Sequence, residues 1–433
     1  MIEKLRNIFQ VPELKRRILF TMVVVAIYRL GEHVPTPGVN VAALQQAFEG
    51  AAGVGGIFGL YDLFVGGAFS QAMIFALGIM PYISASIILQ LLGAVVPYYE
   101  KLRKEGEEGQ KKIIQHTRYG TVLLSILQSF GYAVFLQSGL GPGVVHYPGP
   151  MFIFTTVVTQ TTGTILVMWL GEKITEHGIG NGISLIIFIN IIGRVPNTLR
   201  QAVQNLQGGA NWLLYLVILA GMVAVVASVV LMTQAVRKIP VQYAKRIVGR
   251  RMYGGANTHI PLRVNTAGVI PIIFASSIMI FPSFVAGMFK WTTVQEIFSP
   301  MGWIYNILYG VIIVFFTYFY TAVVLNPNDL AENMRKYGGF IPGIRPGRKT
   351  AEYIDRVLSR ITLPGAVFLA LIAVLPDVIM ANTNARFLAF GGTSMLIVVG
   401  VALDTLQQVE SHLLMRHYEG FVKGGRIRGR QRM

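Results

Sequence analysis

Long apolar stretches separated by short polar segments dominate the chain. A helix needs about 20 mostly apolar residues to cross a bilayer. Ten stretches of this kind are centred on residues 18–30, 72–95, 119–137, 151–170, 183–195, 212–235, 266–287, 304–325, 362–380 and 387–409. The segments between them are too short for a separate soluble domain. The pattern therefore predicts an all-α polytopic membrane protein with ten transmembrane helices.

Composition supports a membrane protein and excludes several other classes. Hydrophobic residues make up 53% of the 433 residues and charged residues make up 13%, whereas a soluble domain is about 25% charged. This balance excludes a disordered chain, a coiled coil and an ordinary water-soluble enzyme. The chain has no cysteine, which excludes disulfides and thiolate chemistry.

The distribution of positive charge predicts the orientation in the membrane. The net charge is +17, and if the N-terminus is placed inside, 32 of the 37 Lys and Arg residues fall on the inner side. Such a bias is typical of cytoplasmic loops. We therefore expect both termini in the cytoplasm. The charge then needs no nucleic-acid partner, although RNA contact by the inner loops stays open.

The first apolar stretch has two interpretations. It follows the basic residues 1–17 and is short, which is typical of a signal peptide. The residues after it, Arg29 to His33, contain no small-residue cleavage site. We therefore expect a retained first helix.

An internal repeat relates the second and seventh stretches. Residues 78–88 and 268–278 match at an offset of 190, with six of eleven positions identical. A copy five stretches later crosses in the opposite direction, so the halves form an inverted repeat with a pathway between them. Pro81 and Pro271 are each expected to kink their helix, because proline removes a backbone donor. The small side chains after each proline would let helices approach closely or separate.

The apolar stretches carry almost no ionisable residues, which pumps and coupled transporters usually need. Asp404, near the inner end of the last stretch, and the boundary residues Glu172 and Arg118 are exceptions. The sequence has no nucleotide-binding loop, no metal-ligand spacing and no nucleophile triad. We therefore expect no enzyme activity and no cofactor.

Residues 52–70 are too short to span a membrane and too apolar for an ordinary loop. Irregular backbone at membrane depth is tolerated only where it is buried in protein or lines a cavity. The residues alone leave two alternatives open. The segment is either an interfacial helix on the outer surface or a half-helix that enters an outer vestibule.

Two inner loops are basic and contain local structure. Residues 237–263 contain two strand-like runs around a basic centre, which indicates a hairpin standing off the membrane. Residues 340–348 form a second basic loop with two prolines. Each loop can be an orientation anchor or a docking site, and the preformed hairpin favours docking to an acidic or RNA-bearing partner.

Several motifs resemble those of the SecY/Sec61 family of protein-conducting channels over essentially the whole length. The motifs that carry the resemblance are residues 74–86, 178–184, 267–271, 340–347 and 391–394. The resemblance implies two inverted five-helix halves that form a clamshell around an hourglass pore. The implied parts are an N-terminal half at 1–205, a C-terminal half at 206–410 with inner loops at 236–264 and 327–361, and a basic tail at 411–433.

The same resemblance implies functional residues by position. The implied pore ring comprises Ile79, Ile83, Ile183, Ile187, Ile273 and Ile397. The implied plug covers about residues 57–70, with the apolar side chains Ile57, Phe58, Leu60, Tyr61, Leu63 and Phe64. The implied lateral gate includes Ser84, Ile87, Gln90, Ser277 and Phe281. The implied docking residues are Lys245, Arg246, Arg250, Arg251, Arg345 and Arg348. A narrow apolar ring dewets and blocks ions without holding a passing polypeptide.

The implied function is passive conduction of secretory polypeptides across the bacterial cytoplasmic membrane, with lateral release of membrane helices. The implied partners are the subunits SecE and SecG, the SecA ATPase, the ribosome, signal sequences, unfolded preproteins and membrane lipids, and also SecDF and YidC. A secondary transporter with inverted repeats is the alternative function, and a structural subunit of a larger complex is a third hypothesis.

Overall fold

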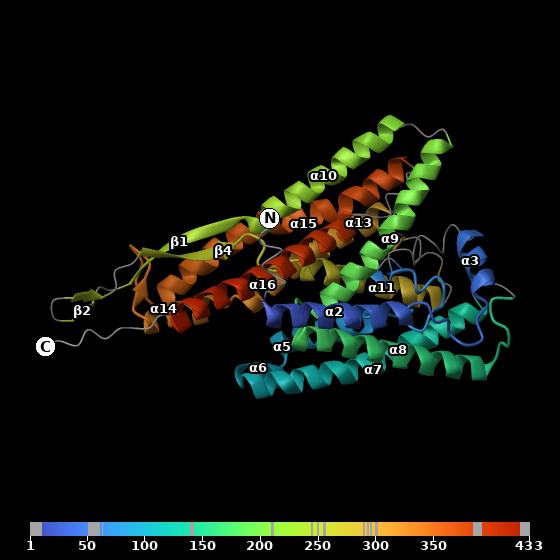
Figure 1. Cartoon of the computed structure of the whole chain (residues 1–433), viewed down its shortest axis with the longest axis horizontal. Coiled ribbons are helices and arrows are strands. Elements are labelled where there is room, and N and C mark those ends of the chain that lie inside the picture. The colour runs from blue at the N-terminus through green and yellow to red at the C-terminus, as the bar shows by residue number, and fades with distance from the viewer. Residues whose placement is uncertain are drawn as a thin grey trace. The chain divides into compact units, whose positions relative to one another are not determined.

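A computed structural model gives the architecture in Figure 1. It describes residues 11–50, 61–62, 64–138, 143–208, 212–243, 246–248, 251–253, 257–288, 291, 294, 297–298, 302–383 and 392–424. The chain divides into two compact units, one formed by Met1–Arg194 with Val401–Met433 and the other by Val195–Gly400. Two helices, α9 (Gly182–Gln207) and α16 (Gly392–Gly424), run from one unit into the other.

The first unit is a bundle of helices. Its members besides parts of α9 and α16 are α2 (Pro12–Gly31), α3 (Val41–Gly50), α5 (Met80–Val95), α6 (Pro97–Lys104), α7 (Glu107–Ser138) and α8 (Pro150–His177). Helix α8 packs against α2 and α7, and α7 packs against α5 (Figure 1). A proline stands in the first turn of α2, α5, α6 and α8, where its missing N–H is not needed.

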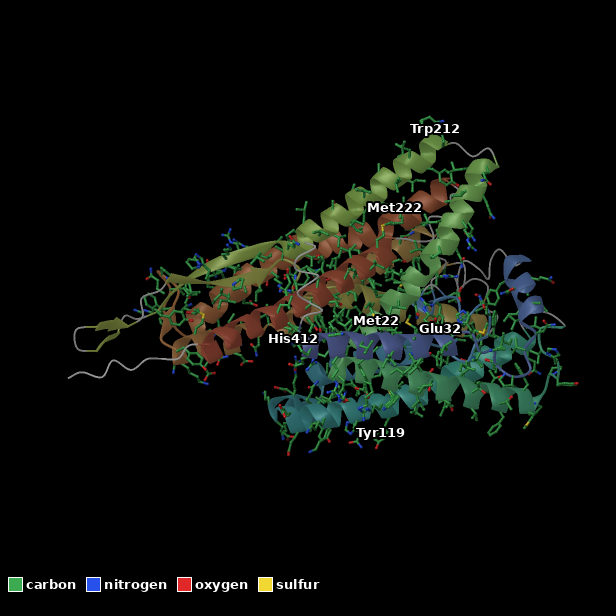
Figure 2. All side chains as sticks on the ribbon, in the orientation of Figure 1. Met22, Glu32, Tyr119, Trp212, Met222 and His412 are labelled. Atoms are coloured by element: carbon green, nitrogen blue, oxygen red, sulfur yellow. The ribbon has the colours of Figure 1, made fainter. Side chains whose placement is uncertain are left out.

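The second unit combines helices with a small sheet. Its helices are α10 (Trp212–Gln234), α11 (Ile270–Met288), α13 (Trp303–Val324), α14 (Pro327–Lys336) and α15 (Arg348–Thr383). Its strands are β1 (Val236–Tyr243), β2 (Arg246–Val248), β3 (Arg251–Tyr253), β4 (Asn257–Arg263) and β5 (Gly339–Phe340). Helix α13 packs against α11 and α15. Helix α10 leaves Trp212 at its start 68% exposed (Figure 2), which suits contact with lipid.

Each of the ten predicted apolar stretches overlaps a helix of the structure. Among the described residues, six helices are long and apolar enough to cross a membrane, and a seventh crossing arises if α5 and α6, bent by 96°, count as one span. The predicted class of helical membrane protein agrees with this result. The number of crossings stays a prediction.

The predicted hairpin is confirmed, and it belongs to a larger structure. Strand β1 pairs antiparallel with β4 over Val236–Gln242 and Arg263–Asn257. Strand β1 also pairs with β5, where Gln242 lies opposite Phe340. The sheet order is therefore β4-β1-β5. The two basic loops that the sequence presents separately are joined in one sheet.

An apolar core holds this sheet against α14 and α15. Its fully or nearly buried members are Ile239, Val241, Leu262, Met334, Ile341, Ile354 and Leu358. Alternate residues of β1 face this core, as the strand period requires. We refer to β1, β4, β5 and the packed parts of α14 and α15 as the basic platform.

Candidate functional site

The two copies of the internal repeat begin their helices in the same way. Helix α5 begins at Met80 and α11 at Ile270, which are 190 positions apart. Gly78 and Gly268 precede these starts by two residues and have φ values of +52° and +62°. Each helix therefore begins with the same left-handed turn, which glycine adopts most easily.

The expected kinks at the two prolines are wrong. Pro81 and Pro271 each stand at the second residue of their helix. Backbone N–H groups in the first turn have no intrahelical acceptor, so proline breaks no bond there. The second apolar stretch was predicted over residues 72–95, but its first part, residues 72–79, forms turns rather than a helix.

The left-handed glycine gives a testable prediction. Gly78→Ala should destabilise the first unit by about 1 kcal/mol, because an L-residue is disfavoured at this φ. A Cβ at this position would also lie 3.1 Å from Val65 Cγ1. Thermal unfolding of the purified protein measures the effect. Gly221→Ala, in α10 with open space around the position, is the control and should not lower the midpoint.

The predicted ring residues lie on four helices or helix starts. In the first unit, Ile79, Ile83 and Ile187 are 2%, 4% and 0% exposed, and Ile183 is half-buried. In the second unit, Ile273 and Ile397 are 5% and 0% exposed. The ring as a whole draws on both units and stays a prediction.

The described part of the predicted plug is buried in the first unit. Tyr61 and Phe64 are 3% and 2% exposed. The Tyr61 hydroxyl donates to the Leu77 carbonyl at 3.0 Å, two residues before Ile79. Asn190, one turn after Ile187, donates to the Phe64 carbonyl at 3.0 Å. This segment therefore lies beside the predicted ring residues of α5 and α9, which disfavours a helix on the outer surface. Ile57, Phe58, Leu60 and Leu63 lie outside the described residues.

The predicted gate residues lie on α5 and α11. On α5, Ile87 is buried, Ser84 is half-buried, and Gln90 Nε2 donates to the Ser86 hydroxyl at 3.2 Å. On α11, the Ser277 hydroxyl is buried and donates to the Ile273 carbonyl at 2.8 Å. The side chain of Phe281 lies outside the described residues. The assignment of these residues to a gate stays a prediction.

Small residues do allow close helix packing in the first unit. A Cβ placed at Gly120 of α7 would lie 3.4 Å from the Ala85 Cβ of α5. Both residues lie within the helix pair α5 and α7, which pack along each other. The backbones can approach this closely only because both side chains are small.

Of the predicted docking residues, Arg345 and Arg348 lie next to the basic platform, between β5 and α15. Arg345 and Arg348 are exposed in the turn that leads from β5 into α15. The Thr350 hydroxyl donates to the Arg345 carbonyl at 2.9 Å, which fixes this turn. Arg246 and Arg251 belong to the paired strands β2 and β3. Lys245 and Arg250 lie outside the described residues.

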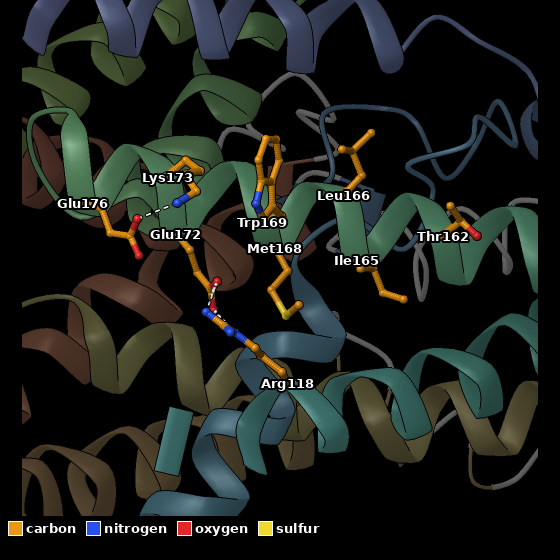
Figure 3. A pocket seen from close by; sticks show the side chains of 9 residues that line it. All are labelled: Arg118, Thr162, Ile165, Leu166, Met168, Trp169, Glu172, Lys173 and Glu176. Atoms are coloured by element: carbon orange, nitrogen blue, oxygen red, sulfur yellow. Dashed lines mark hydrogen bonds and ion pairs between the residues drawn. The ribbon is translucent and has the colours of Figure 1, made fainter. Parts of the chain in front are cut away.

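A separate groove of about 540 Å³ lies between α7 and α8 (Figure 3). Apolar side chains of α8 form most of its wall, and ion pairs stand at one end. Arg118 lies 2.7 Å from Glu172, and Lys173 lies 2.7 Å from Glu176. Each cation is balanced by a carboxylate, so the groove is electrically neutral. Its lining contains none of the predicted ring, plug or gate residues.

A polar cluster that the sequence pattern does not reveal lies next to the predicted plug segment. Asp62 pairs with Arg194, and Arg29 pairs with Glu32. Both arginines are among the five Lys and Arg residues that the charge count leaves on the outer side. Burial raises the pKa of the Glu32 carboxyl, and the nearby Arg29 opposes that shift. Charged residues directly next to apolar stretches are the signal that could have identified the cluster. Within the described ranges, no group of His, Asp or Glu could hold a metal ion.

These features define a polytopic helical membrane protein with repeated helix starts and a folded basic platform. The SecY family model matches residues 73–406. A protein translocase subunit SecY from Thermotoga maritima is 45% identical over 100% of both chains. The corresponding subunit from Thermus thermophilus is 48% identical, also over 100% of both chains. The chain therefore belongs to the SecY family.

Solved structures show the same fold at lower sequence identity. A structure described as a protein conducting channel has a TM-score of 0.65 at 18% identity and covers 92% of both chains. A SecY structure described in terms of its plug domain, which stabilises the closed state, has a TM-score of 0.63 at 18% identity and 92% coverage of both chains. Sec61 in a canine ribosome-channel complex has a TM-score of 0.60 at 17% identity, again with 92% coverage of both chains.

Proposed function

We propose that this chain forms the pore of a protein-conducting channel in the bacterial cytoplasmic membrane. The channel passes secretory polypeptides across the membrane and releases membrane helices sideways into lipid. The observation that carries this proposal is the identity of 45% and 48% to two protein translocase subunits over the full length of both chains. This similarity favours the channel over a secondary transporter or a purely structural subunit.

The residues of the chain support a passive pathway. Isoleucines at the ring positions offer no hydrogen bonds to a moving polypeptide and exclude water when the channel is closed. The segment containing Tyr61 and Phe64 lies beside the ring positions and closes the pathway as a plug. Residues on α5 and α11 form a gate toward lipid. Because none of these groups performs chemistry, the energy for transport comes from a partner.

The partners follow from the platform and from the family. Arg345 and Arg348 stand exposed on the basic platform and suit an acidic or RNA-bearing surface. The similarity to Sec61 in a ribosome-channel complex supports the ribosome as one such partner. SecA is the proposed motor, SecE and SecG are the proposed companion subunits, and SecDF and YidC are further proposed partners. Both termini and the platform are placed in the cytoplasm on the basis of the charge bias.

Reconstitution tests the proposed function. The chain is inserted into vesicles with its companion subunits, and a preprotein is added with the motor ATPase and ATP. Protection of the preprotein from external protease measures its transport. ATP-dependent protection that requires this chain supports the channel. A complete, correctly inserted complex that transports no preprotein but takes up a small solute would instead support a transporter.

Removal of the plug gives a separate prediction. Deleting residues 57–67 should raise ion leak through the closed channel by about tenfold, because the buried Tyr61 and Phe64 no longer fill the pathway. Conductance of planar bilayers containing the variant measures the leak. Tyr147→Ala, at a side chain that is 85% exposed in the loop before α8, is the control and should leave conductance unchanged. If the deletion variant leaks no more ions than the wild type, the segment has only a structural role.

A further inference from the structure

The groove between α7 and α8 lies on two helices that are long and apolar enough to cross a membrane. It runs along α8 from Glu176 to Thr162 (Figure 3), which corresponds to a rise of about 21 Å along the helix. Since the hydrocarbon core of a bilayer is about 30 Å thick, the groove is longer than one leaflet is deep. It therefore has room for a headgroup at one end and an acyl chain along the rest.

The groove is apolar along most of its length and charged only at one end. Leu166 and Trp169 in its wall are 40% and 50% exposed. Trp169 stands one turn before Glu172, and Tyr119 of α7, which is 63% exposed, follows Arg118 directly. Tryptophan and tyrosine are enriched at the level of the lipid headgroups. The aromatic side chains therefore place the charged end of the groove at the headgroup level.

The ion pairs at the charged end leave one donor and one acceptor unused among the described residues. Arg118 donates from Nε and Nη2 to the two carboxylate oxygens of Glu172, at 3.0 Å and 2.7 Å, and its Nη1 group has no partner in the described part of the chain. Lys173 donates to Glu176 Oε2 at 2.7 Å, and within the same ranges Glu176 Oε1 has no partner. An arginine N–H suits a phosphate oxygen, and a carboxylate oxygen suits an ammonium group.

The charges at this end select the headgroup. Two cations and two carboxylates line it, so their sum is zero. An anionic headgroup such as that of phosphatidylglycerol would find a cation for its phosphate but nothing to pair with the carboxylates. A zwitterionic headgroup brings a phosphate for Arg118 and an ammonium group for Glu176. A primary ammonium has three N–H donors, whereas the quaternary ammonium of choline has none.

We propose that the groove between α7 and α8 is a binding site for phosphatidylethanolamine. The phosphate accepts from Arg118 Nη1, the ammonium donates to Glu176 Oε1, and one acyl chain lies along Leu166 and Trp169. The lining belongs to the first unit and contains none of the predicted ring, plug or gate residues. The site is therefore independent of the proposed channel function. The bound lipid contacts both helices and stabilises the first unit, because a ligand that binds only the folded state raises its stability.

Fluorescence quenching in vesicles tests whether this lipid is preferred. Val158→Cys, one turn beyond the groove on the same face of α8, introduces the only thiol of the chain, and this thiol carries a fluorophore. The whole complex is placed in vesicles of equal parts phosphatidylethanolamine and phosphatidylglycerol, with a nitroxide on the acyl chain of one lipid at a time. Quenching should correspond to a preference for phosphatidylethanolamine of about fivefold, the effect of one favourable exposed ion pair. Phe130→Cys, at a 46% exposed position of α7 outside the groove, should show no preference.

Two variants change the charge of the groove in opposite directions. Glu176→Gln leaves one net positive charge and should transfer the preference to phosphatidylglycerol. Arg118→Gln removes the phosphate donor, so quenching by both lipids at the α8 label should fall to the level of the α7 label. Glu100→Gln is the matched control, because it removes a carboxylate from an ion pair with Lys104 that is also 2.7 Å long but lies on α6 outside the groove. This control should keep the wild-type preference.

Three results would overturn the site. Equal quenching by the two lipids at Val158→Cys, or the same preference at Phe130→Cys, would mean ordinary contact with the bilayer. Absence of quenching at Val158→Cys alone would mean that a helix of a partner chain fills the groove. Phosphatidylcholine that quenches as strongly as phosphatidylethanolamine would mean that the ammonium group is not recognised.

Thermal unfolding of the complex gives a second measurement. Added phosphatidylethanolamine should raise the midpoint of the wild type but not that of Glu176→Gln. The Glu176 side chain is 51% exposed, so this variant retains the packing of α8. An equal rise in the wild type and the variant would contradict the role of Glu176 in the site.

Discussion

Replacing Ile83 and Ile187 together with serine is expected to raise the ion conductance of the closed channel by about tenfold or more. Full burial of one isoleucine side chain is favourable by about 1.5–3 kcal/mol, and a barrier lower by about 1.4 kcal/mol raises a rate tenfold. If the predicted ring is a dewetted constriction, two hydroxyl groups there let water, and with it ions, enter. Single-channel or planar-bilayer recordings measure the change.

Matched controls come from the same two helices. Ile88 of α5 is 48% exposed and Ile192 of α9 is 40% exposed, in contrast to Ile83 at 4% and Ile187 at 0%. Ile88→Ser with Ile192→Ser makes the same chemical change away from the predicted ring, so conductance should stay at the wild-type level. Equal leak in both double variants would show general loosening of the bundle. If the double variant Ile83→Ser, Ile187→Ser conducts no more ions than the wild type, the predicted ring is wrong.

Arg345→Glu is expected to reduce transport driven by the motor or the ribosome by about tenfold. Reversal of a charge at a complementary surface slows association and weakens the complex. The turn cannot rearrange easily, because the Thr350 hydroxyl holds the Arg345 carbonyl and Ile341 is anchored in the platform core. Transport into vesicles at low and moderate salt measures the effect.

The control for this change is Arg356→Glu. Arg356 is an exposed arginine on α15, within the same unit, and it undergoes the same change of charge. We expect a much smaller reduction, since this position stands on a regular helix outside the predicted docking turn. Normal transport by Arg345→Glu, or equal loss in the two variants, would refute the role of the turn.

The internal repeat was predictable from the sequence alone, because equivalent residues recur at a fixed offset. Gly78 and Gly268 are visible as equivalent residues from the sequence, and the structure gives both a positive φ directly before a helix. The inferred kinks were wrong because proline has opposite effects in the first turn and in the interior of a helix. The sequence pattern places Pro81 within an apolar stretch but does not reveal that the helix begins only at Met80.

The features that could not be predicted from the sequence depend on contacts between residues far apart in the chain. The β1–β4 hairpin was predictable because both strands and their turn are local in the sequence. The pairing of β1 with β5 joins Gln242 to Phe340, and no local pattern specifies such a pair. The Asp62–Arg194 ion pair likewise joins residues 132 positions apart. One sequence shows that both residues are charged, but only the fold shows that they meet.

Crosslinking at the predicted ring tests whether a polypeptide passes between these isoleucines. Because the chain has no cysteine, Ile83→Cys introduces the only thiol, and a secretory polypeptide carrying one cysteine is stalled in transit. We expect a disulfide between the two thiols, and none when the cysteine replaces the exposed Ile88 instead. A demonstrably stalled polypeptide that forms no disulfide with Ile83→Cys, or that reacts equally at both positions, would contradict a pathway through these isoleucines.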